Sequence, residues 1–199
     1  MTADAPIGLF DSGVGGLSIM KEVRRLLPGE DLIYVADSQY CPYGEKRPAE
    51  IRERSAVITL FLQEQGAKVV VVACNTASVA ALEYLRAEFP LPIVGVEPAV
   101  KQAALHSKNK KVGILATGVT LAGERYASLV ERFGGDLTVI NQPCPGLVEK
   151  VEAGEIDSRE TKALLQQYLQ PLQAEGVDVV VLGCTHYPFL KPLVRQLVA

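Results

Sequence analysis

The sequence predicts an α/β protein made of two similar three-layer halves, each with a mainly parallel sheet covered by helices. Short runs of β-branched and aliphatic residues alternate with longer amphipathic stretches along the chain, which is typical of parallel strands joined by helical crossovers. In addition, two segments of the first half recur in the same order in the second half. Together these observations favour two pseudo-symmetric α/β domains.

In the first half, proline and glycine separate the predicted strands and helices. Pro48 begins a helix, because its fixed φ angle suits the first turn, and Gly66 ends that helix. The valines at 69–72 predict a strand that is buried on both faces. The predicted strands are Ile7–Phe10, Asp31–Val35, Lys68–Ala73 and Pro92–Val96, and the predicted helices are Leu17–Leu27, Pro48–Gln65 and Ser78–Phe89.

The same alternation restarts in the second half of the chain. The predicted strands there are Lys111–Leu115, Leu137–Ile140 and Val177–Leu182, and the predicted helices are Leu121–Phe133, Leu147–Ala153, Ser158–Glu175 and Phe189–Val198. No low-complexity segment or long linker separates the halves. We therefore expect a domain boundary near 96–101, with one α/β domain over residues 1–97 and a second over residues 98–199.

The internal repeat brings one cysteine to the same place in each half. Segment 7–14 resembles segment 112–119, which lies 105 residues further on. Segment 69–76 resembles segment 179–186, at an offset of 110 residues. Both members of this second pair contain a valine-rich strand with a cysteine close behind it. Chance similarity between valine-rich strands explains the strands but not the matching cysteines.

These two cysteines, Cys74 and Cys184, are the candidate catalytic residues. Ligands of open α/β sheets bind at the carboxyl ends of the strands, and a thiol near a helix N-terminus has a pKa below the free value of about 8.5. Two such halves facing a shared interdomain cleft would present their thiols to opposite faces of one substrate. Inversion of a stereocentre needs that arrangement, because one group removes the α-proton and the other returns a proton. The sequence therefore predicts a racemase with two opposed acid/base catalysts.

The polar residues near these thiols extend the candidate site. Asn75, Thr76 and Thr185 are candidates for binding a substrate carboxylate, together with amides at the helix starts. Asp11 and His186 are candidates for tuning the thiols and are counted with the catalytic set. The structural alternatives are that Asp11 caps a turn and that His186 is a capping or core group.

Composition and charge argue against several other classes of protein. The chain has 199 residues, a formal net charge of −3 and no run of like charges, so it lacks the electrostatic features of a nucleic-acid-binding protein. Its apolar runs are too short to span a bilayer, and its acidic N-terminus does not resemble a signal peptide. The four cysteines are widely spaced, which argues against a disulfide framework or a structural zinc site. We expect a cytoplasmic protein with no bound metal, no nucleic-acid partner and no membrane association.

Four sequence blocks resemble those of the glutamate racemases, which belong to the aspartate/glutamate racemase superfamily. The blocks are Asp11–Leu17, Pro42–Gly44, Ala73–Ala77 and Gly183–Pro188, and they occur in the family's order. The resemblance implies a two-domain α/β fold with the active site between the domains. It also implies the interconversion of L- and D-glutamate without a cofactor, which supplies D-glutamate for peptidoglycan synthesis, cell-wall biogenesis and cell shape.

The resemblance further implies a role for individual residues. Cys74 is implied as the base that acts on D-glutamate, and Cys184 as the base that acts on L-glutamate. The residues implied to surround the substrate are Asp11, Ser12, Tyr43, Gly44, Asn75, Thr76, Thr185 and His186. Thr117, Thr120 and Glu152 also resemble residues near the family's site.

Three features depart from the family's pattern. Gly123 stands where the family more often has serine, and Cys41 before the Pro42 block is unusual. Family members also continue well past the region of Leu197, and their final segment returns to the first domain. We expect this return segment to be absent here, which would remove part of the usual packing of the first domain.

Other functions remain open from the residues alone. A cysteine hydrolase or amidase, with Cys184 or Cys74 as nucleophile and His186 as base, explains one thiol and the imidazole but not the second thiol. An aspartate racemase or a related isomerase of the same superfamily is a closer alternative. A non-catalytic binding protein with two lobes is a third. The sequence does not give the oligomeric state, so a homodimer is neither required nor excluded.

Overall fold

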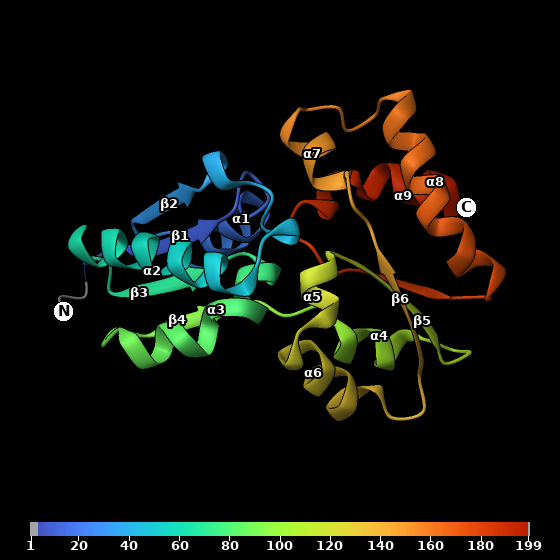
Figure 1. Cartoon of the computed structure of the whole chain (residues 1–199), viewed down its shortest axis with the longest axis horizontal. Helices are drawn as coiled ribbons and strands as arrows, with labels where there is room; N and C mark the ends of the chain where they lie inside the picture. Colours follow the sequence, from blue (N-terminus) through green and yellow to red (C-terminus); the bar gives the residue numbers. More distant parts are fainter. Residues whose placement is uncertain (1–3, 199) are drawn as a thin grey trace. The chain divides into compact units, whose positions relative to one another are not determined.

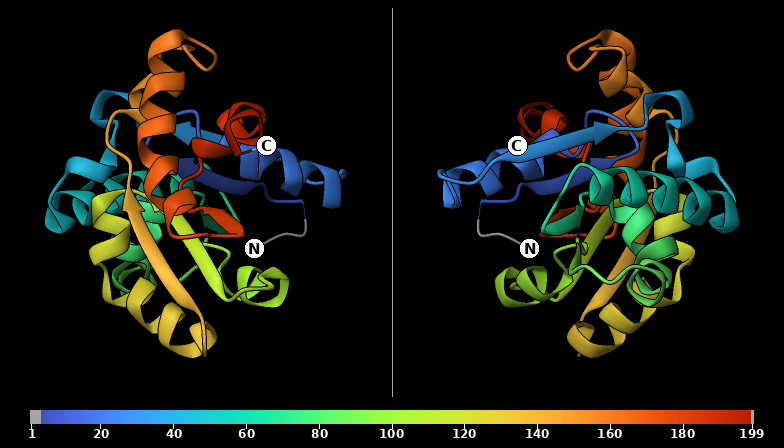
Figure 2. Two further views of the ribbon diagram at one scale, coloured as in Figure 1. Left: turned by 90° about the vertical axis from the view of Figure 1, so that its right-hand side faces the viewer. Right: turned by 90° about the vertical axis from the view of Figure 1, so that its left-hand side faces the viewer.

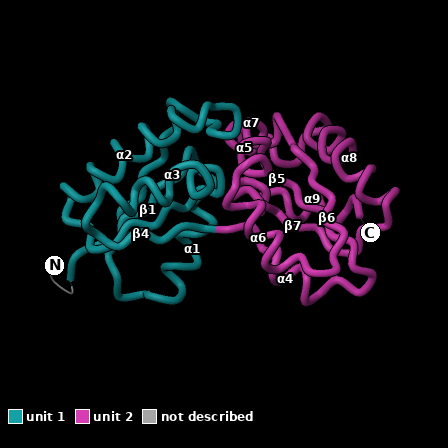
Figure 3. The backbone as a smooth tube through the Cα atoms, turned by 60° about the horizontal axis from the view of Figure 1, so that its bottom comes forward, with its two compact units in different colours: residues 1–96 teal, residues 97–199 magenta. Residues whose placement is uncertain are grey.

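The computed structural model describes residues 4–198 of the chain. The chain divides into two compact units, residues 1–96 and residues 97–199, which are called unit 1 and unit 2 below (Figure 3). Each unit contains a sheet of parallel strands flanked by helices, so the predicted α/β fold class is confirmed. The helices within residues 4–198 include none with both the length and the apolar character of a membrane span.

Unit 1 is built on a four-stranded sheet in the order β2-β1-β3-β4, in which every strand pair is parallel (Figure 1). The strands are β1 (Ile7–Asp11), β2 (Leu32–Ala36), β3 (Val69–Val72) and β4 (Ile93–Gly95). The helices are α1 (Leu17–Leu26), α2 (Pro48–Glu64) and α3 (Asn75–Glu88), with two short 3-10 helices, η1 (Ser38–Tyr40) and η2 (Tyr43–Glu45), before α2. All five residues of the inner strand β1 are buried.

Successive side chains along each strand of unit 1 point to opposite faces of its sheet, and helices cover both faces (Figure 2). Ile7 and Leu9 point to one face, where residues of α1 such as Met20 pack against them. Gly8 points to the opposite face, where an added Cβ atom would lie 3.1 Å from Leu62 of α2. Helices α2 and α3 pack against each other. Unit 1 is therefore a three-layer arrangement of helix, sheet and helices.

Unit 2 has a three-stranded parallel sheet in the order β6-β5-β7. Its strands are β5 (Lys111–Ala116), β6 (Thr138–Pro143) and β7 (Val179–Leu182). Its helices are α4 (Val100–His106), α5 (Gly118–Ala122), α6 (Glu124–Gly134), α7 (Leu147–Glu152), α8 (Arg159–Ala174) and α9 (Lys191–Val198), and the 3-10 helix η3 (Tyr187–Leu190) precedes α9. The helices α8 and α9 pack against each other, as do α4 and α6.

The two units share their strand order and one detail of packing. In each unit the first strand, β1 or β5, pairs with the second strand on one side and the third on the other. Gly113 of β5 faces Leu172 of α8, as Gly8 of β1 faces Leu62 of α2. Leu172 follows Leu62 by 110 residues, which is the offset that separates the two candidate cysteines. The topology and the packing thus support the internal repeat seen in the sequence.

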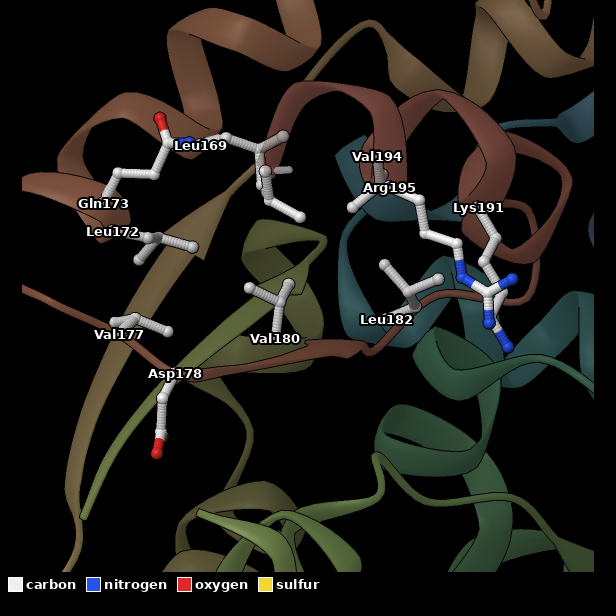
Figure 4. A pocket seen from close by; sticks show the side chains of 11 residues that line it. Leu169, Leu172, Gln173, Val177, Asp178, Val180, Leu182, Lys191, Val194 and Arg195 are labelled. Carbon is white, nitrogen blue, oxygen red and sulfur yellow. The ribbon is translucent and has the colours of Figure 1, made fainter. Parts of the chain in front are cut away.

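A cavity of about 330 Å³ lies in unit 2 between α8, β7 and α9 (Figure 4). Val180 and Leu182 of β7 point into the space between the two helices, while the carboxylate of Asp178 points away from it. Lys191 and Arg195 of α9 line one end. None of the residues that line this cavity belongs to the predicted site, so the cavity is separate from the candidate catalytic residues.

Three predicted helices differ from the observed ones by more than one residue, each for a local reason. The helix predicted over 121–133 is interrupted, because the backbone of Gly123 is extended (φ −83°, ψ 142°) and separates α5 from α6. The helix predicted from Ser78 begins three residues earlier, at Asn75, because Cys74 serves as its N-cap. The helix predicted from Phe189 is preceded by a 3-10 turn and becomes α-helical only at Lys191.

Candidate active site

Cys74 lies at the carboxyl end of β3 and caps the N-terminus of α3. Its backbone is extended (φ −119°, ψ 122°), and its sulfur accepts a hydrogen bond from the amide of Ala77 at 3.5 Å. The thiol takes the place of the serine or aspartate side chain that usually satisfies the first amides of a helix. The amide donor and the positive end of a 14-residue helix both favour negative charge on the sulfur. Only 4% of Cys74 is exposed.

Beside this thiol, the side chain of Asn75 carries a polar atom without a partner. Its Oδ1 is buried and accepts no hydrogen bond, and 8% of the residue is exposed. A buried acceptor left unpaired costs about 1–3 kcal/mol. Such an atom in a folded protein calls for an explanation, and a ligand that brings a donor is one. Thr76, the next residue of the helix, is also buried.

The carboxyl end of β1 carries Asp11 and a tight turn. Asp11 is fully buried, and its Oδ2 accepts a hydrogen bond from the amide of Gly16 at 2.7 Å. The hydroxyl of Tyr34 in β2 donates to the carbonyl of Gly13 at 2.6 Å. An added Cβ atom at Gly16 would lie 2.7 Å from that hydroxyl, so the turn requires glycine at this position. Ser12 is buried within the same turn, which the Asp11 carboxylate caps.

Tyr43 and Gly44 lie in η2, on the segment between β2 and α2. Tyr43 is 1% exposed, and its hydroxyl donates to Oδ2 of Asp37 at 2.6 Å. Burial and this hydrogen bond raise the pKa of the Tyr43 hydroxyl far above its ordinary value, so the group stays protonated and acts as a donor. Gly44 is partly exposed. On the same segment, the sulfur of Cys41 lies 3.9 Å from the hydroxyl of Ser12.

Cys184 follows β7 and faces the imidazole of His186. Its sulfur lies 3.8 Å from Nδ1 of His186, and Nε2 of the same ring lies 2.5 Å from Oε1 of Glu152 at the end of α7. His186 is 1% exposed and Cys184 is 6% exposed. A neutral imidazole that donates its Nε2–H to the carboxylate has Nδ1 as an acceptor, and that atom is directed at the thiol. The arrangement can therefore pass a proton between the thiol and the ring.

Buried tyrosines support the chain around Cys184. The hydroxyl of Tyr187 donates to the carbonyl of Cys144 at 3.2 Å, and the hydroxyl of Tyr168 donates to the carbonyl of Pro145 at 2.7 Å. Burial raises the pKa of Tyr187 well above its ordinary value, and the nearby Cys184 adds to the effect. Burial also raises the pKa of the Cys144 thiol to about 12. Cys144 therefore stays protonated and packs, in contrast to a catalytic thiol.

Two threonines follow β5 in unit 2, as Ser12 follows β1 in unit 1. Thr117 is the N-cap of α5, and its Oγ1 accepts a hydrogen bond from the amide of Thr120 at 3.2 Å. The two hydroxyl oxygens are 2.9 Å apart, and both residues are buried. Thr185, which lies between Cys184 and His186 in the sequence, is buried as well.

The structure thus places the predicted site residues in two groups, one at the carboxyl end of each sheet. Unit 1 holds Asp11, Ser12, Tyr43, Gly44, Cys74, Asn75 and Thr76, and unit 2 holds Thr117, Thr120, Glu152, Cys184, Thr185 and His186. Two further residues were not predicted from the sequence: Asp37, which accepts the Tyr43 hydroxyl, and Arg54, which is paired with Asp37. The sequence does contain a feature that could have identified Asp37: this residue directly follows β2, just as Asp11 ends β1, and the carboxyl ends of strands are where ligands bind.

The whole site lies within a match to one family of enzymes. The family model for Asp/Glu/Hydantoin racemase matches residues 7–199. The chain belongs to the Asp/Glu/hydantoin racemase family. The predicted family resemblance and the predicted enzyme class, an isomerase, are therefore confirmed. The glutamate racemase of Ectopseudomonas mendocina (strain ymp) is 57% identical to this chain over 197 residues, which cover 98% of this chain and 75% of that protein.

Two solved structures show how closely this member of the racemase family follows known folds. The crystal structure of glutamate racemase isoform RacE1 from Bacillus anthracis has a TM-score of 0.90 at 34% identity and covers 100% of this chain and 75% of that chain. The crystal structure of Escherichia coli glutamate racemase in complex with L-glutamate and the activator UDP-MurNAc-Ala has a TM-score of 0.89 at 41% identity. It covers 98% of this chain and 75% of that chain.

Proposed function

We propose that this racemase interconverts L- and D-glutamate, with Cys74 and Cys184 as two acid/base catalysts and without a cofactor or metal. One observation carries the proposal: each unit presents a buried thiol directly beyond its third strand, β3 or β7, at equivalent positions of the repeat. The similarity to glutamate racemases, one of them crystallised with L-glutamate, supports glutamate as the substrate.

Two thiols suit a reaction that must run in both directions. In the L-to-D direction, the Cys184 thiolate removes the α-proton of L-glutamate, and the Cys74 thiol gives its proton to the opposite face of the carbanion. D-glutamate then leaves Cys184 as a thiol and Cys74 as a thiolate, which is the state that starts the reverse reaction. The substrate and product have the same mass, and no electrons are gained or lost.

Unit 1 offers groups that stabilise the Cys74 thiolate and groups that bind the amino-acid substrate. The Ala77 amide and the start of α3 stabilise the thiolate of Cys74. The unpaired Oδ1 of Asn75 is an acceptor, so its natural partner is the α-ammonium group of the amino acid. A substrate carboxylate needs hydrogen-bond donors, which the hydroxyls of Ser12 and Thr76 supply. The turn of Tyr43 and Gly44 supplies a surface against which the carboxylate lies.

Unit 2 offers a route for the proton of Cys184. Nδ1 of His186 accepts the thiol proton, and the carboxylate of Glu152 stabilises the imidazolium that forms. His186 and Glu152 therefore prepare the thiolate that attacks the α-proton of L-glutamate. The hydroxyls of Thr117, Thr120 and Thr185 complete the set of polar groups on this side.

The proposed product, D-glutamate, has a cellular use. D-glutamate is a building block of peptidoglycan, so the reaction would supply cell-wall synthesis and support cell shape. In this proposal the enzyme works in the cytoplasm.

Racemisation in deuterated water tests the reaction and the number of bases together. The purified chain is incubated with L-glutamate without added cofactor, while optical rotation and the α-proton signal are followed. We expect rotation to fall and solvent deuterium to enter the D-enantiomer first, because each face of the substrate meets a different base. Deuterium appearing equally early in both enantiomers would contradict the two-base mechanism.

Cysteine variants test the two named catalysts. We expect Cys74→Ser and Cys184→Ser each to lose nearly all racemisation while keeping the circular dichroism spectrum of the parent chain. Cys144→Ser is the matched control, because its thiol is buried and stays protonated, and we expect it to remain active. A Cys74 or Cys184 variant with full activity would refute the mechanism. Faster turnover of aspartate than of glutamate would instead assign the chain to aspartate.

A cysteine hydrolase is the second candidate, because Cys184, His186 and Glu152 form a chain of nucleophile, base and orienting carboxylate. Its product would differ in mass from its substrate, and an acyl-enzyme would accumulate on Cys184. Mass spectrometry of substrate amides and of the protein separates the two functions. Hydrolysis that survives Cys74→Ser would favour the hydrolase, because that chemistry does not use the second thiol.

A further inference from the structure

Arg54 of α2 and Asp37 form a bidentate ion pair beside the segment that carries Tyr43. Nε of Arg54 lies 3.0 Å from Oδ2 of Asp37, and Nη2 lies 2.8 Å from Oδ1. The side chain of Asp37 is 8% exposed and that of Arg54 is 23% exposed. A planar guanidinium that meets a carboxylate through two parallel hydrogen bonds fixes orientation as well as distance.

The Asp37 carboxylate joins this ion pair to the candidate site. Its Oδ2 also accepts the hydroxyl of Tyr43 at 2.6 Å, and its backbone amide donates to the carbonyl of Asp11 at 3.0 Å. The guanidinium carbon of Arg54 lies 3.9 Å from the ring centre of Tyr40, within the range of a cation–π contact. Arg54 therefore contacts Asp37 and Tyr40 directly and reaches Tyr43 through the Asp37 carboxylate.

The segment from residue 37 to residue 47 depends on such side-chain contacts. It contains only the short turns η1 and η2, with backbone hydrogen bonds such as Tyr40 N–H to Asp37 C=O and Lys46 N–H to Tyr43 C=O. The hydrogen bonds to Asp37 raise the pKa of Arg54, so the guanidinium remains charged. Removal of Arg54 would leave the buried carboxylate without its cationic partner, and the carboxylate would turn toward water and release the Tyr43 hydroxyl.

We infer that Asp37 and Arg54 are positioning residues, which hold the turn of Tyr43 and Gly44 in the place where it contacts the substrate. This inference rests on the proposed function, in which that turn lines the glutamate site. A displacement of about 1 Å in a group that positions a substrate can reduce an enzyme's efficiency by about 100-fold. The pair therefore acts on substrate binding through Tyr43 and takes no part in proton transfer.

Substitutions on α2 test the inference. Arg54→Met keeps the length of the side chain and removes the guanidinium, whereas Arg54→Lys keeps the charge but loses the bidentate geometry. Arg52→Met is the matched control, because Arg52 is exposed on the same helix and donates to the carbonyl of Ala80. The measurements are KM and kcat for both enantiomers, the melting temperature, and amide hydrogen exchange over residues 38–46.

We expect Arg54→Met to raise KM by about 10-fold or more and to lower kcat less, since it acts on substrate position. Exchange over residues 38–46 should accelerate in this variant, with Arg54→Lys intermediate and Arg52→Met like the parent. Unchanged exchange, or faster exchange with unchanged KM, would overturn the inference. If Arg54→Met does not fold, the double variant Asp37→Asn with Arg54→Met removes both charges and takes its place.

The proposed function and the positioning role of Asp37 and Arg54 can be refuted separately. A parent chain that does not racemise glutamate refutes the proposed function, yet the exchange measurement still reports whether Arg54 holds the segment. A parent chain that racemises glutamate while Arg54→Met has its KM and exchange rates refutes the positioning role alone.

Discussion

Substitution of Gly113 by alanine should destabilise unit 2, whereas the equivalent change at Gly8 should leave unit 1 nearly unaffected. A Cβ atom at Gly113 would lie 2.6 Å from Cδ1 of Leu172, while a Cβ atom at Gly8 would lie 3.1 Å from the nearest atom of Leu62. Carbon atoms prefer separations of about 3.5–4.0 Å. Leu172 is almost fully buried and lines the cavity between α8, β7 and α9, so its side chain can relieve the overlap only by turning into that cavity.

The size of the effect follows from two opposing contributions. Overpacking of a core costs about 1–3 kcal/mol, and Gly113→Ala falls in the middle of that range, because the overlap is large but Leu172 borders a cavity. Alanine also restricts the unfolded chain, which returns about 0.5–1 kcal/mol. We therefore expect Gly113→Ala to lower the free energy of unfolding by about 1–2 kcal/mol. For Gly8→Ala, the smaller overlap and the entropic gain should nearly cancel.

A second substitution provides an internal test. Leu172→Ala alone should cost about 2–5 kcal/mol, because it opens a cavity. In that background the methyl group of Gly113→Ala fills part of the space, so the change should become neutral or stabilising. The two substitutions should thus show an interaction energy of about 1–3 kcal/mol.

Urea unfolding followed by circular dichroism measures these differences, and amide hydrogen exchange of β5 assigns the loss to unit 2. The exchange measurement is needed because two units can unfold at different urea concentrations. Equal stability of Gly113→Ala and the parent chain would refute the packing argument. The same loss of stability from Gly113→Ala, whether residue 172 is leucine or alanine, would also refute it.

Two further predictions concern buried polar groups. The thiol of Cys144 has a pKa of about 12, above its ordinary value of 9.0, so the unfolded chain loses this proton before the folded one. Stability should therefore fall as the pH rises from 9 toward 12, by up to about 1.4 kcal/mol per pH unit, and Cys144→Ala should flatten the decline seen in urea unfolding. An equal decline in both proteins would contradict this. The hydroxyl of Ser55 is buried without a hydrogen-bond partner, so Ser55→Ala should leave stability unchanged or raise it by up to about 1 kcal/mol. A lower urea midpoint in that variant would contradict this expectation.

Much of the fold could be predicted from the sequence, because it rests on patterns that are local in the chain. The valines of β3 and β7 mark buried strands, and the position of each cysteine just beyond them places it at a carboxyl end. The first residues of the helices were harder to predict than the strands. Residues 75, 76 and 78 are all types that favour N-caps, and cysteine is not among the usual capping residues, so the pattern predicted Ser78 where Cys74 is the true cap.

The contacts that organise the site depend on packing that no local pattern reveals. His186 meets Glu152 across 34 residues, which requires α7 to lie beside η3. Asp37 meets Arg54 across 17 residues, which requires the segment after β2 to fold back on α2. The sequence could therefore name His186 and Asp11 from their places after strands. The partners that hold such residues become visible only when the helices are placed.

The two thiols lie in unlike surroundings: a helix N-terminus at Cys74 and an imidazole at Cys184. In an assembly of two identical subunits, every mutation beside one thiol would also occur beside the other. A chain that encodes both halves separately is free of that constraint, so selection can alter the neighbours of one thiol alone. Under the proposed two-thiol mechanism, such changes adjust how fast each enantiomer is processed and how tightly each is held. They leave the final mixture unchanged, because mirror-image molecules have equal free energy in water.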